Sequence, residues 1–433
     1  MRTHRSRTAR AVVITGLTAG LALSGCARAG ETTTEASDGA PTEILMWTHS
    51  AGNDGELTVY DQIIEDFNAS QDQYTVVTEA FPQSSYNDSI VAAAASGDLP
   101  CLISMDGPIM PNWAWAGYIQ PLDLPTSLTD SLLPTAVGTY QDEIYSVGYW
   151  DAAIAIFARQ SVLDANGIRI PTVDQPWTKD EFDAALTTLK QAGYETPLDI
   201  GAEDTGEWWS YAYLPFLASF GGDEINRETY LSADGYLNGP DAVAAFTWFQ
   251  DVFKNGWSSA GGTIGNQEFI DGDAALAYTG VWNAKAALEA VGDDLLILPP
   301  PDFGHGAKTG GGSWTFGITS QCQAADGARE YLEFSFQDEY IAAFSDNQVV
   351  IPATDGAAAM SEYFGADGSL EAFVEISKAF AMMRPETPAY PVISSQFEKA
   401  AKEIMNGADV QSTLNVATQE IDTNIESNDG YGF

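Results

Sequence analysis

The sequence predicts an α/β protein with two domains, each built on a mostly parallel sheet flanked by helices. After an N-terminal leader and a polar linker, about 390 of the 433 residues remain, which is more than one ordinary hydrophobic core serves. Strand-like and helix-like segments alternate along these residues, as they do in parallel sheets covered by helices. With 45% hydrophobic residues, the chain can bury enough apolar surface to fold throughout.

The first segments after the linker establish this alternation. Residues 43–47, 74–78 and 101–104 are short β-prone runs, and residues 90–95 favour a helix. Between the first two runs, apolar side chains recur at the i, i+3, i+4, i+7 spacing of a helix: Tyr60, Ile63, Ile64 and Phe67. The resulting order, β-α-β-α-β, predicts parallel strands with helices on both faces of the sheet.

Later segments carry clearer helix signals. Thr178 and Glu181 have the spacing of a capping box, which marks the start of a helix. Another helix is predicted over 241–254, where phenylalanines gather on one side. Two further apolar stripes of helical spacing lie near the C-terminus: 397–404 and 414–425. The second half of the chain therefore also predicts helices that cover a sheet.

Residues 1–25 have the layout of a signal peptide. Four arginines precede an uncharged run over 11–25, and this run of about 15 residues is shorter than the ~20 that a transmembrane helix needs. Leu23 to Cys26 resembles the bacterial lipobox, which implies a diacylglyceryl group on Cys26 and an anchor on the outer face of the cytoplasmic membrane. Residues 26–41 then predict a flexible linker. The alternative is an incidental Cys26 beside an ordinary signal-peptidase site.

The charge of the chain is strongly acidic. Eighteen basic residues stand against 61 acidic ones, for a formal net charge of −43. Such a surface repels phosphate backbones and anionic lipids, so nucleic acid and direct contact with a lipid surface are not expected. Solubility is a sufficient explanation for the excess of acids.

Two cysteines remain once Cys26 carries lipid. In an oxidising compartment Cys101 and Cys322 tend to pair, and a bridge between them would close a loop of about 220 residues. The alternative, two separate buried thiols, is left open by the residues themselves.

The chain offers little for catalysis or for metal binding. After the signal peptide, only His49 and His305 remain, and no HExxH, CxxC or GxSxG spacing occurs. The glycine-rich stretch 304–312 lacks the spacing of a P-loop, so we expect a mobile loop there. We therefore expect neither an enzyme, nor a cofactor, nor a metal site. A glycosidase that uses two of the many carboxylates stays an alternative.

Tryptophans stand at the ends of predicted strands. Trp47 closes the first strand, and Trp150, Trp282 and Trp314 follow or begin later β-prone segments. Open α/β sheets bind ligands beyond the carboxyl ends of their strands, so these rings stand where a ligand would lie. Each of them taken singly could equally be a core residue.

An ordered series of motifs resembles the extracellular solute-binding proteins of carbohydrate ABC importers. The resemblance covers nearly all of the chain after the linker, and each motif is weak alone. The motifs are Trp47 to His49, 97–100, 117–123, 145–151, 176–178, Gly221-Gly222, 271–276, 280–282, the glycines 310–312 before Trp314, and 384–390.

The resemblance implies a two-domain periplasmic-binding-protein-like fold of type II with a three-segment hinge. The crossing segments would lie near 148–151, 316–319 and 350–353. The lobes would then be 42–150 plus 318–351 and 151–317 plus 352–433. In the family, the strands that carry Cys101 and Cys322 are antiparallel neighbours, so the resemblance favours the disulfide.

The resemblance also implies a sugar site that combines flat rings with fixed polar groups. The stacking candidates are Trp282, Trp314 and Trp150, with Trp208, Trp209 and Tyr211 as a second cluster. The hydrogen-bonding candidates are His49, Ser50, Asp106, Asp151, Arg384, Glu207 and the backbone around Gly312 and Ser313. For Arg384, an ordinary ion pair is the alternative. The family's positive residue after the first strand is replaced here by Ala51 to Asn53, which puts the contacts of the first lobe in doubt.

The implied function is that of a monomeric, lipid-anchored binding protein. It would capture a carbohydrate, an oligosaccharide because several rings are available, and close its hinge around it. It would then deliver the sugar to an ABC permease in the membrane. The alternatives are the same scaffold for a polyol or a glycerophosphodiester, and a surface glycosidase. The sequence names neither the sugar nor its linkage.

Overall fold

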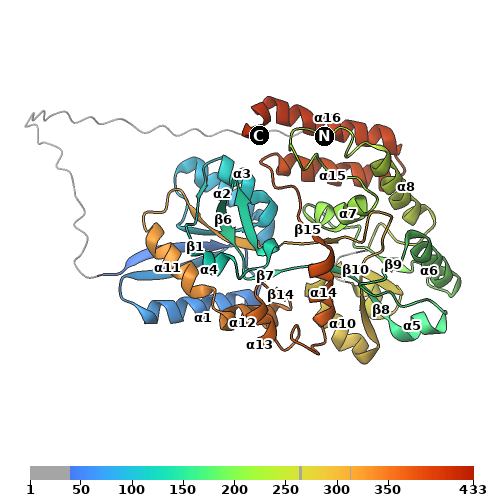
Figure 1. Cartoon of the computed structure of the whole chain (residues 1–433), viewed down its shortest axis with the longest axis horizontal. Helices are drawn as coiled ribbons and strands as arrows, with labels where there is room; N and C mark the ends of the chain where they lie inside the picture. The colour runs from blue at the N-terminus through green and yellow to red at the C-terminus, as the bar shows by residue number, and fades with distance from the viewer. Residues whose placement is uncertain (1–39, 263–265, 313) are drawn as a thin grey trace, which may run out of the picture. The chain divides into compact units, whose positions relative to one another are not determined.

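The structure is a computed structural model that describes residues 40–262, 266–312 and 314–433. Its compact body is Pro41–Phe433 (Figure 1). The predicted signal peptide, the lipid-bearing Cys26 and nearly all of the linker lie outside the described residues, and so does Ser313. No helix within the described part of the chain is long and apolar enough to cross a membrane.

The first lobe is built on a seven-stranded sheet with the order β2-β1-β3-β13-β6-β5, where β4 also pairs with β13. These strands are β1 (Thr42–Thr48), β2 (Tyr74–Ala80), β3 (Leu102–Asp106), β4 (Ile119–Gln120), β5 (Val137–Tyr140), β6 (Glu143–Val147) and β13 (Trp314–Thr319). The three strands predicted from the N-terminal segments are all present as β1, β2 and β3.

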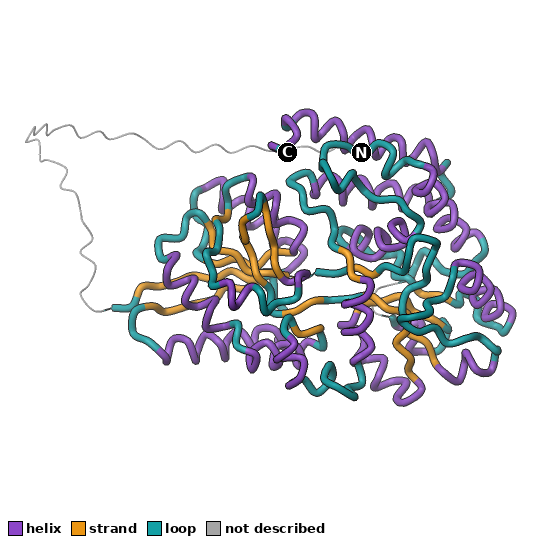
Figure 2. Tube along the Cα trace, viewed as in Figure 1, coloured by secondary structure: helices purple, strands orange, loops and turns teal. Residues whose placement is uncertain are grey.

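The second lobe is built on a four-stranded sheet with the order β11-β8-β10-β9. Its strands are β8 (Ile154–Arg159), β9 (Leu198–Asp199), β10 (Leu276–Gly280) and β11 (Leu295–Leu298). Figure 2 shows the strands of the two sheets as two separate groups.

The expectation of mostly parallel sheets is wrong, because both sheets are mixed. β1 runs parallel to β2 and β3, but β13 runs antiparallel to β3, β4 and β6. In the second sheet only β10 and β9 are parallel. The reason is connectivity: β5 and β6 form a hairpin, and β13 returns to the first sheet from a distant part of the chain. Local β-α-β alternation does not reveal such returns.

Helices cover both sheets. Those packed with the first sheet are α1 (Asp54–Ser70), α2 (Gln83–Ser96), α3 (Met110–Trp115), α4 (Thr126–Thr129), α11 (Ala325–Ser335) and α12 (Asp338–Gln348), followed by α13 (Asp355–Met360). The others are α5 (Gln160–Ala165), α6 (Lys179–Gln191), α7 (Trp208–Ser219), α8 (Pro240–Lys254), α9 (Gln267–Asp271), α10 (Ala284–Val291), α14 (Glu371–Phe380), α15 (Tyr390–Met405) and α16 (Val410–Ser427). The predicted capping box is formed at the start of α6, where the Thr178 hydroxyl accepts from the Glu181 N–H.

Two short two-stranded sheets complete the fold, and one of them joins two of the predicted crossings. β7 (Trp150–Asp151) pairs antiparallel with β14 (Ile351–Pro352), and β12 (Thr309–Gly310) pairs parallel with β15 (Ala381–Met382). The segments predicted to cross near 148–151 and 350–353 therefore lie side by side. The third predicted crossing, 316–319, falls inside β13, which pairs with β3 from Trp314 onward. We propose that this crossing precedes Trp314; the lobe boundaries themselves stay a prediction.

Cys101 and Cys322 form a disulfide, as predicted. Their Cα atoms lie 4.2 Å apart, and Thr319 N–H donates to the Cys101 carbonyl beside them. The bridge fastens the start of β3 to the end of β13, which are antiparallel neighbours. It thereby joins segments 221 residues apart in the sequence.

Candidate functional site

Trp314 and His49 form a stacked pair at the ends of two strands that lie on either side of β3 in the first sheet. Trp314 begins β13 opposite Asp106, the last residue of β3, and His49 directly follows β1. The two ring centroids are 3.5 Å apart and the rings are inclined by only 10°. The resemblance implied that His49 hydrogen-bonds the rim of a sugar. Only 6% of its surface is exposed, and its ring packs against the indole.

A polar network fixes the imidazole of His49. Its Nδ1 lies 3.1 Å from Ser104 Oγ, which also accepts from the His49 backbone N–H at 3.1 Å. On the other edge, Nε2 lies 3.6 Å from Glu56 Oε2, and that carboxylate accepts from the Ser50 hydroxyl. Burial lowers the pKa of His49 to about 3 and raises the pKa of Glu56. Ser50, predicted to bind ligand, is buried and engaged with Glu56.

Trp282 lies in the second lobe, in the turn that follows β10. Its ring covers Gly280: a Cβ built on that glycine would lie 2.2 to 2.4 Å from three atoms of the indole. Trp208 meets the ring edge-on at a centroid distance of 6.4 Å, and Tyr211 lies 6.0 Å away at a tilt of 39°. Trp208 and Tyr211 of the predicted second cluster thus lie beside Trp282, and only a glycine at position 280 leaves room for the ring of Trp282.

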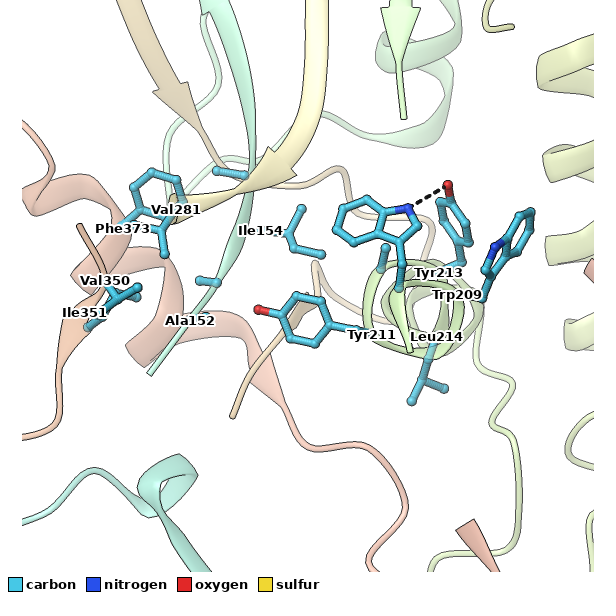
Figure 3. Close-up of a cluster of buried hydrophobic side chains, with 14 of the residues drawn as sticks. Ala152, Ile154, Trp209, Tyr211, Tyr213, Leu214, Val281, Val350, Ile351 and Phe373 are labelled. Atoms are coloured by element: carbon cyan, nitrogen blue, oxygen red, sulfur yellow. Dashed lines mark hydrogen bonds between the residues drawn. The ribbon is translucent and has the colours of Figure 1, made fainter. Parts of the chain in front are cut away.

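Trp209 is not part of that cluster. Figure 3 shows Tyr211 leaving α7 toward Ala152 and Ile154, whereas Trp209 leaves it on another side. Trp209 is fully buried, and its Nε1 donates to the Asp204 carbonyl. The prediction that Trp209 stacks on a ligand conflicts with this burial. Neighbouring positions of a helix point about 100° apart, so Trp209 leaves α7 on a different side from Trp208.

Arg384 lies between two carboxylates. It makes a two-pronged ion pair with Asp106 at 2.7 and 2.8 Å, and its Nη1 also donates to Glu207 Oε2 at 2.8 Å. Glu207 accepts further hydrogen bonds from Tyr390 and from Ser394. The guanidinium lies 5.2 Å from the ring of Tyr211. The ion pair that was the alternative for Arg384 is therefore present, and a hydrogen bond from Arg384 to a ligand stays a prediction.

The Arg384 network is electrostatically constrained. Desolvation within this network raises the pKa of Glu207, although 45% of its side chain is exposed, and the charge of Arg384 counteracts the shift. Within the described residues, the Nε of Arg384 is buried and has no hydrogen-bond partner.

Asp151 is a fully buried carboxylate. It accepts from the Gly312 N–H at 2.7 Å and from the Ser377 hydroxyl at 2.7 Å. Burial raises its pKa above the ordinary value of an aspartate. These contacts favour a structural role, in which Asp151 holds the glycine segment before Trp314, over the predicted contact with ligand. Gly312 needs its residue type because its φ is +92°.

Trp150 is only partly buried and stacks on Phe344 of α12, with centroids 6.3 Å apart and an angle of 17°. It therefore packs against α12 from its place in β7. Sequence reasoning also missed Glu56, Ser104 and Ser394, because none belongs to a recognisable motif. It missed the role of Tyr390 as well, although that residue ends the quoted motif 384–390. Gly280 stood within a quoted motif, but its contact with Trp282 could not be read from it.

Two surface cavities lie elsewhere, and no described group suggests a metal site. One cavity is lined by residues around Tyr74 and Cys322, the other by residues around Lys190 and Trp257. Neither shares a residue with the clusters of Trp314 and Trp282. Among the described residues, no three histidine, cysteine or acidic side chains are grouped as metal ligands.

Two mixed α/β lobes, joined by paired crossing strands and carrying aromatic rings at strand ends, define a solute-binding protein. Residues 62–372 match the family described as bacterial extracellular solute-binding protein. The match spans more than half of the chain, and the chain belongs to this family.

Solved structures and a relative resemble the chain over most of its length. The cyclic alpha-maltosyl-1,6-maltose binding protein of Arthrobacter globiformis aligns with a TM-score of 0.76 and 21% identity, over 90% of this chain and all of that one. The GacH receptor of Streptomyces glaucescens, solved unliganded and with acarbose, gives 0.73 and 17%, over 89% and 98%. An uncharacterized lipoprotein of Streptomyces antibioticus is 21% identical over 316 residues, 69% of this chain and 68% of that one. The two structures confirm the predicted two-domain periplasmic-binding-protein-like fold.

Proposed function

We propose that this protein captures an oligosaccharide outside the cytoplasmic membrane and passes it to an ABC permease. The observation that carries the proposal is the pair of supported tryptophans, Trp314 in one lobe and Trp282 in the other. Sugar rings present an apolar face of C–H groups, and flat aromatic rings held in place are the groups that bind such faces.

The polar groups near these rings suit the hydroxyl rim of a sugar. Arg384 is held rigidly by Asp106 and Glu207 and lies against Tyr211, which itself packs on Trp282. These contacts hold its guanidinium in one orientation. Pre-oriented donors reduce the entropy lost when a ligand binds. One similar solved structure is a cyclic alpha-maltosyl-1,6-maltose binding protein, and another was solved in complex with acarbose. These ligands support an oligosaccharide over a single sugar.

The same carboxylates argue against a glycosidase. Hydrolysis of a glycosidic bond needs two carboxyl groups free to act as acid and as base or nucleophile. Asp106, which faces Trp314 across the sheet, and Glu207 are both engaged with Arg384. We therefore propose that the protein binds its sugar without turnover. We also propose that it needs no cofactor and acts as a monomer.

Location and delivery complete the proposal. Lipid on Cys26 and the linker 26–41 would keep the body near its permease, with residues 1–25 removed as the signal peptide. Sugar contacts from both lobes would favour a closed hinge, because only a difference in affinity between two states shifts their populations.

A binding panel tests the proposal. Mono- and oligosaccharides, a polyol and a glycerophosphodiester are compared by thermal shift and calorimetry, and the mixtures are then analysed for products. We expect one class of oligosaccharide to stabilise the protein without turnover. Product formation, or stabilisation by the non-sugar solutes alone, would contradict the proposal.

Variants locate the site. Trp314→Ala and Trp282→Ala should each weaken binding about 100-fold, the effect of losing a central aromatic contact. Trp115→Ala serves as a matched control because this tryptophan is 45% exposed on α3, away from both clusters. Unchanged affinity in both site variants would refute the site.

A further inference from the structure

We propose that His49 is a positioning residue, an uncharged aromatic platform that orients the indole of Trp314 for a sugar ring. The inference rests on the proposed function and adds a residue that acts only through another one. The stacking geometry carries it: the centroids are 3.5 Å apart, the rings are nearly parallel, and the histidine is almost fully buried. A ligand cannot reach the imidazole, but it can benefit from the orientation that the imidazole imposes.

The hydrogen bonds of His49 leave its ring only one orientation. The Ser104 hydroxyl accepts from the His49 backbone N–H and can then donate its own hydrogen to Nδ1. The ring hydrogen is thereby placed on Nε2, which faces Glu56 Oε2 at 3.6 Å. With both edges assigned, rotation of the ring would break contacts on two sides.

A third ring restricts sideways movement of the pair. Tyr86 is fully buried and lies edge-on to both rings, 6.3 Å from His49 and 6.0 Å from Trp314. Its hydroxyl donates to the Trp47 carbonyl at 3.0 Å. Edge-on contacts of this kind are favourable for aromatic pairs. The indole is thus supported on one face by His49 and beside it by Tyr86.

The platform stays neutral over the pH range outside a cell. Burial holds the pKa of His49 near 3, and Glu56 is the acidic group that the structure places against it. Tyr86 is the other titratable group in ring contact, and burial raises its pKa far above that range. Orientation of Trp314 by His49 should therefore not change between about pH 5 and 8.

Substitutions at His49 test the proposal through sugar affinity. His49→Ala should weaken oligosaccharide binding about tenfold, because an aromatic pair contributes roughly that factor. His49→Phe keeps a flat ring and should restore affinity to within about threefold of the wild type. Ile63→Ala is the control for general damage: this buried side chain of α1 lies in the same lobe, so its loss should lower Tm without changing the sugar Kd.

A second measurement needs no sugar. In protein labelled with 5-fluorotryptophan, the ¹⁹F resonance of Trp314 is assigned by its loss in Trp314→Phe. That resonance should move in His49→Ala and return toward its wild-type position in His49→Phe, while Ile63→Ala leaves it in place. An unmoved resonance in His49→Ala, or a sugar affinity unchanged by it while Trp314→Ala abolishes binding, would overturn the platform. If the wild type binds no sugar, the proposed function fails and the resonance still decides the role of His49.

Discussion

The two tryptophans proposed to hold the ligand are supported in opposite ways. Trp314 rests on the buried imidazole of His49, whose Nδ1 is hydrogen-bonded to Ser104 and whose Nε2 faces Glu56. Trp282 rests on a bare stretch of backbone at Gly280 and on the rings of Trp208 and Tyr211. The first support depends on hydrogen bonds, and the second depends on the absence of a side chain.

This difference predicts different sensitivities. Changes of polarity should disturb Trp314, because buried polar groups that lose a partner are costly. Changes of volume should disturb Trp282, because close-packed regions do not absorb an added methyl group. Arg384 couples the two regions, since it pairs with Asp106 opposite Trp314 and lies against Tyr211 beside Trp282.

The largest effect on stability should come from the disulfide, which fastens the end of β13, the strand that Trp314 begins, to the start of β3. The double variant Cys101→Ser/Cys322→Ser should lower the free energy of unfolding by about 4 to 5 kcal/mol, because the bridge closes a loop of 221 residues. Denaturant unfolding measures this, and calorimetry should show little change in sugar affinity of the folded fraction. A strong loss of affinity would mean that the bridge also shapes the site.

Arg384→Ala should have the next largest effect. It leaves Asp106 and Glu207 without their cation, and removing one partner of a buried ion pair costs about 3 to 5 kcal/mol. Because Glu207 is partly exposed, we expect the lower end of that range. Adding Asp106→Asn should recover part of the loss in a double-mutant cycle. Additive losses would show that the two groups are not coupled.

Gly280→Ala should act on Trp282 alone. The added Cβ would lie within 2.4 Å of the indole, so the ring must move, and sugar binding should weaken about tenfold or more. Gly272→Ala controls for the loss of a nearby glycine, since nothing lies within 4 Å of its added Cβ, although its positive φ costs some stability. The ¹⁹F resonance of Trp282 should shift only in the first variant, and that of Trp314 in neither.

The smallest effect concerns the pH dependence of stability, and it again distinguishes the two lobes. Burial raises the pKa of Glu224 to about 8, above its ordinary value of 4.5, so the folded protein binds a proton that the unfolded chain has released. Its contribution to stability is complete below pH 4.5 and is lost as pH rises toward 8. Glu224→Gln should flatten this slope in pH-dependent unfolding. Above pH 6.5, His49→Phe should leave the slope unchanged, because His49 is uncharged there in both the folded and the unfolded state.

Much of the local structure followed from the sequence. Helical stripes at Tyr60 to Phe67 and near the C-terminus became α1, α15 and α16, and the Thr178 capping box formed as expected. These features depend on neighbours within a few residues, whose spacing the sequence displays directly. The resemblance of ordered motifs extended this to the fold, the family and the pairing of Cys101 with Cys322.

The sequence by itself thus determined the elements, the fold class and the types of residue a sugar site would use. Only the tertiary structure decided that β13 enters the first sheet antiparallel, that His49 lies under Trp314, and that Asp151 faces inward. It alone also paired Arg384 with Asp106, 278 residues away. Such contacts depend on strand order, register and side-chain direction across the whole fold, and a one-residue change of register would reverse which face each side chain occupies.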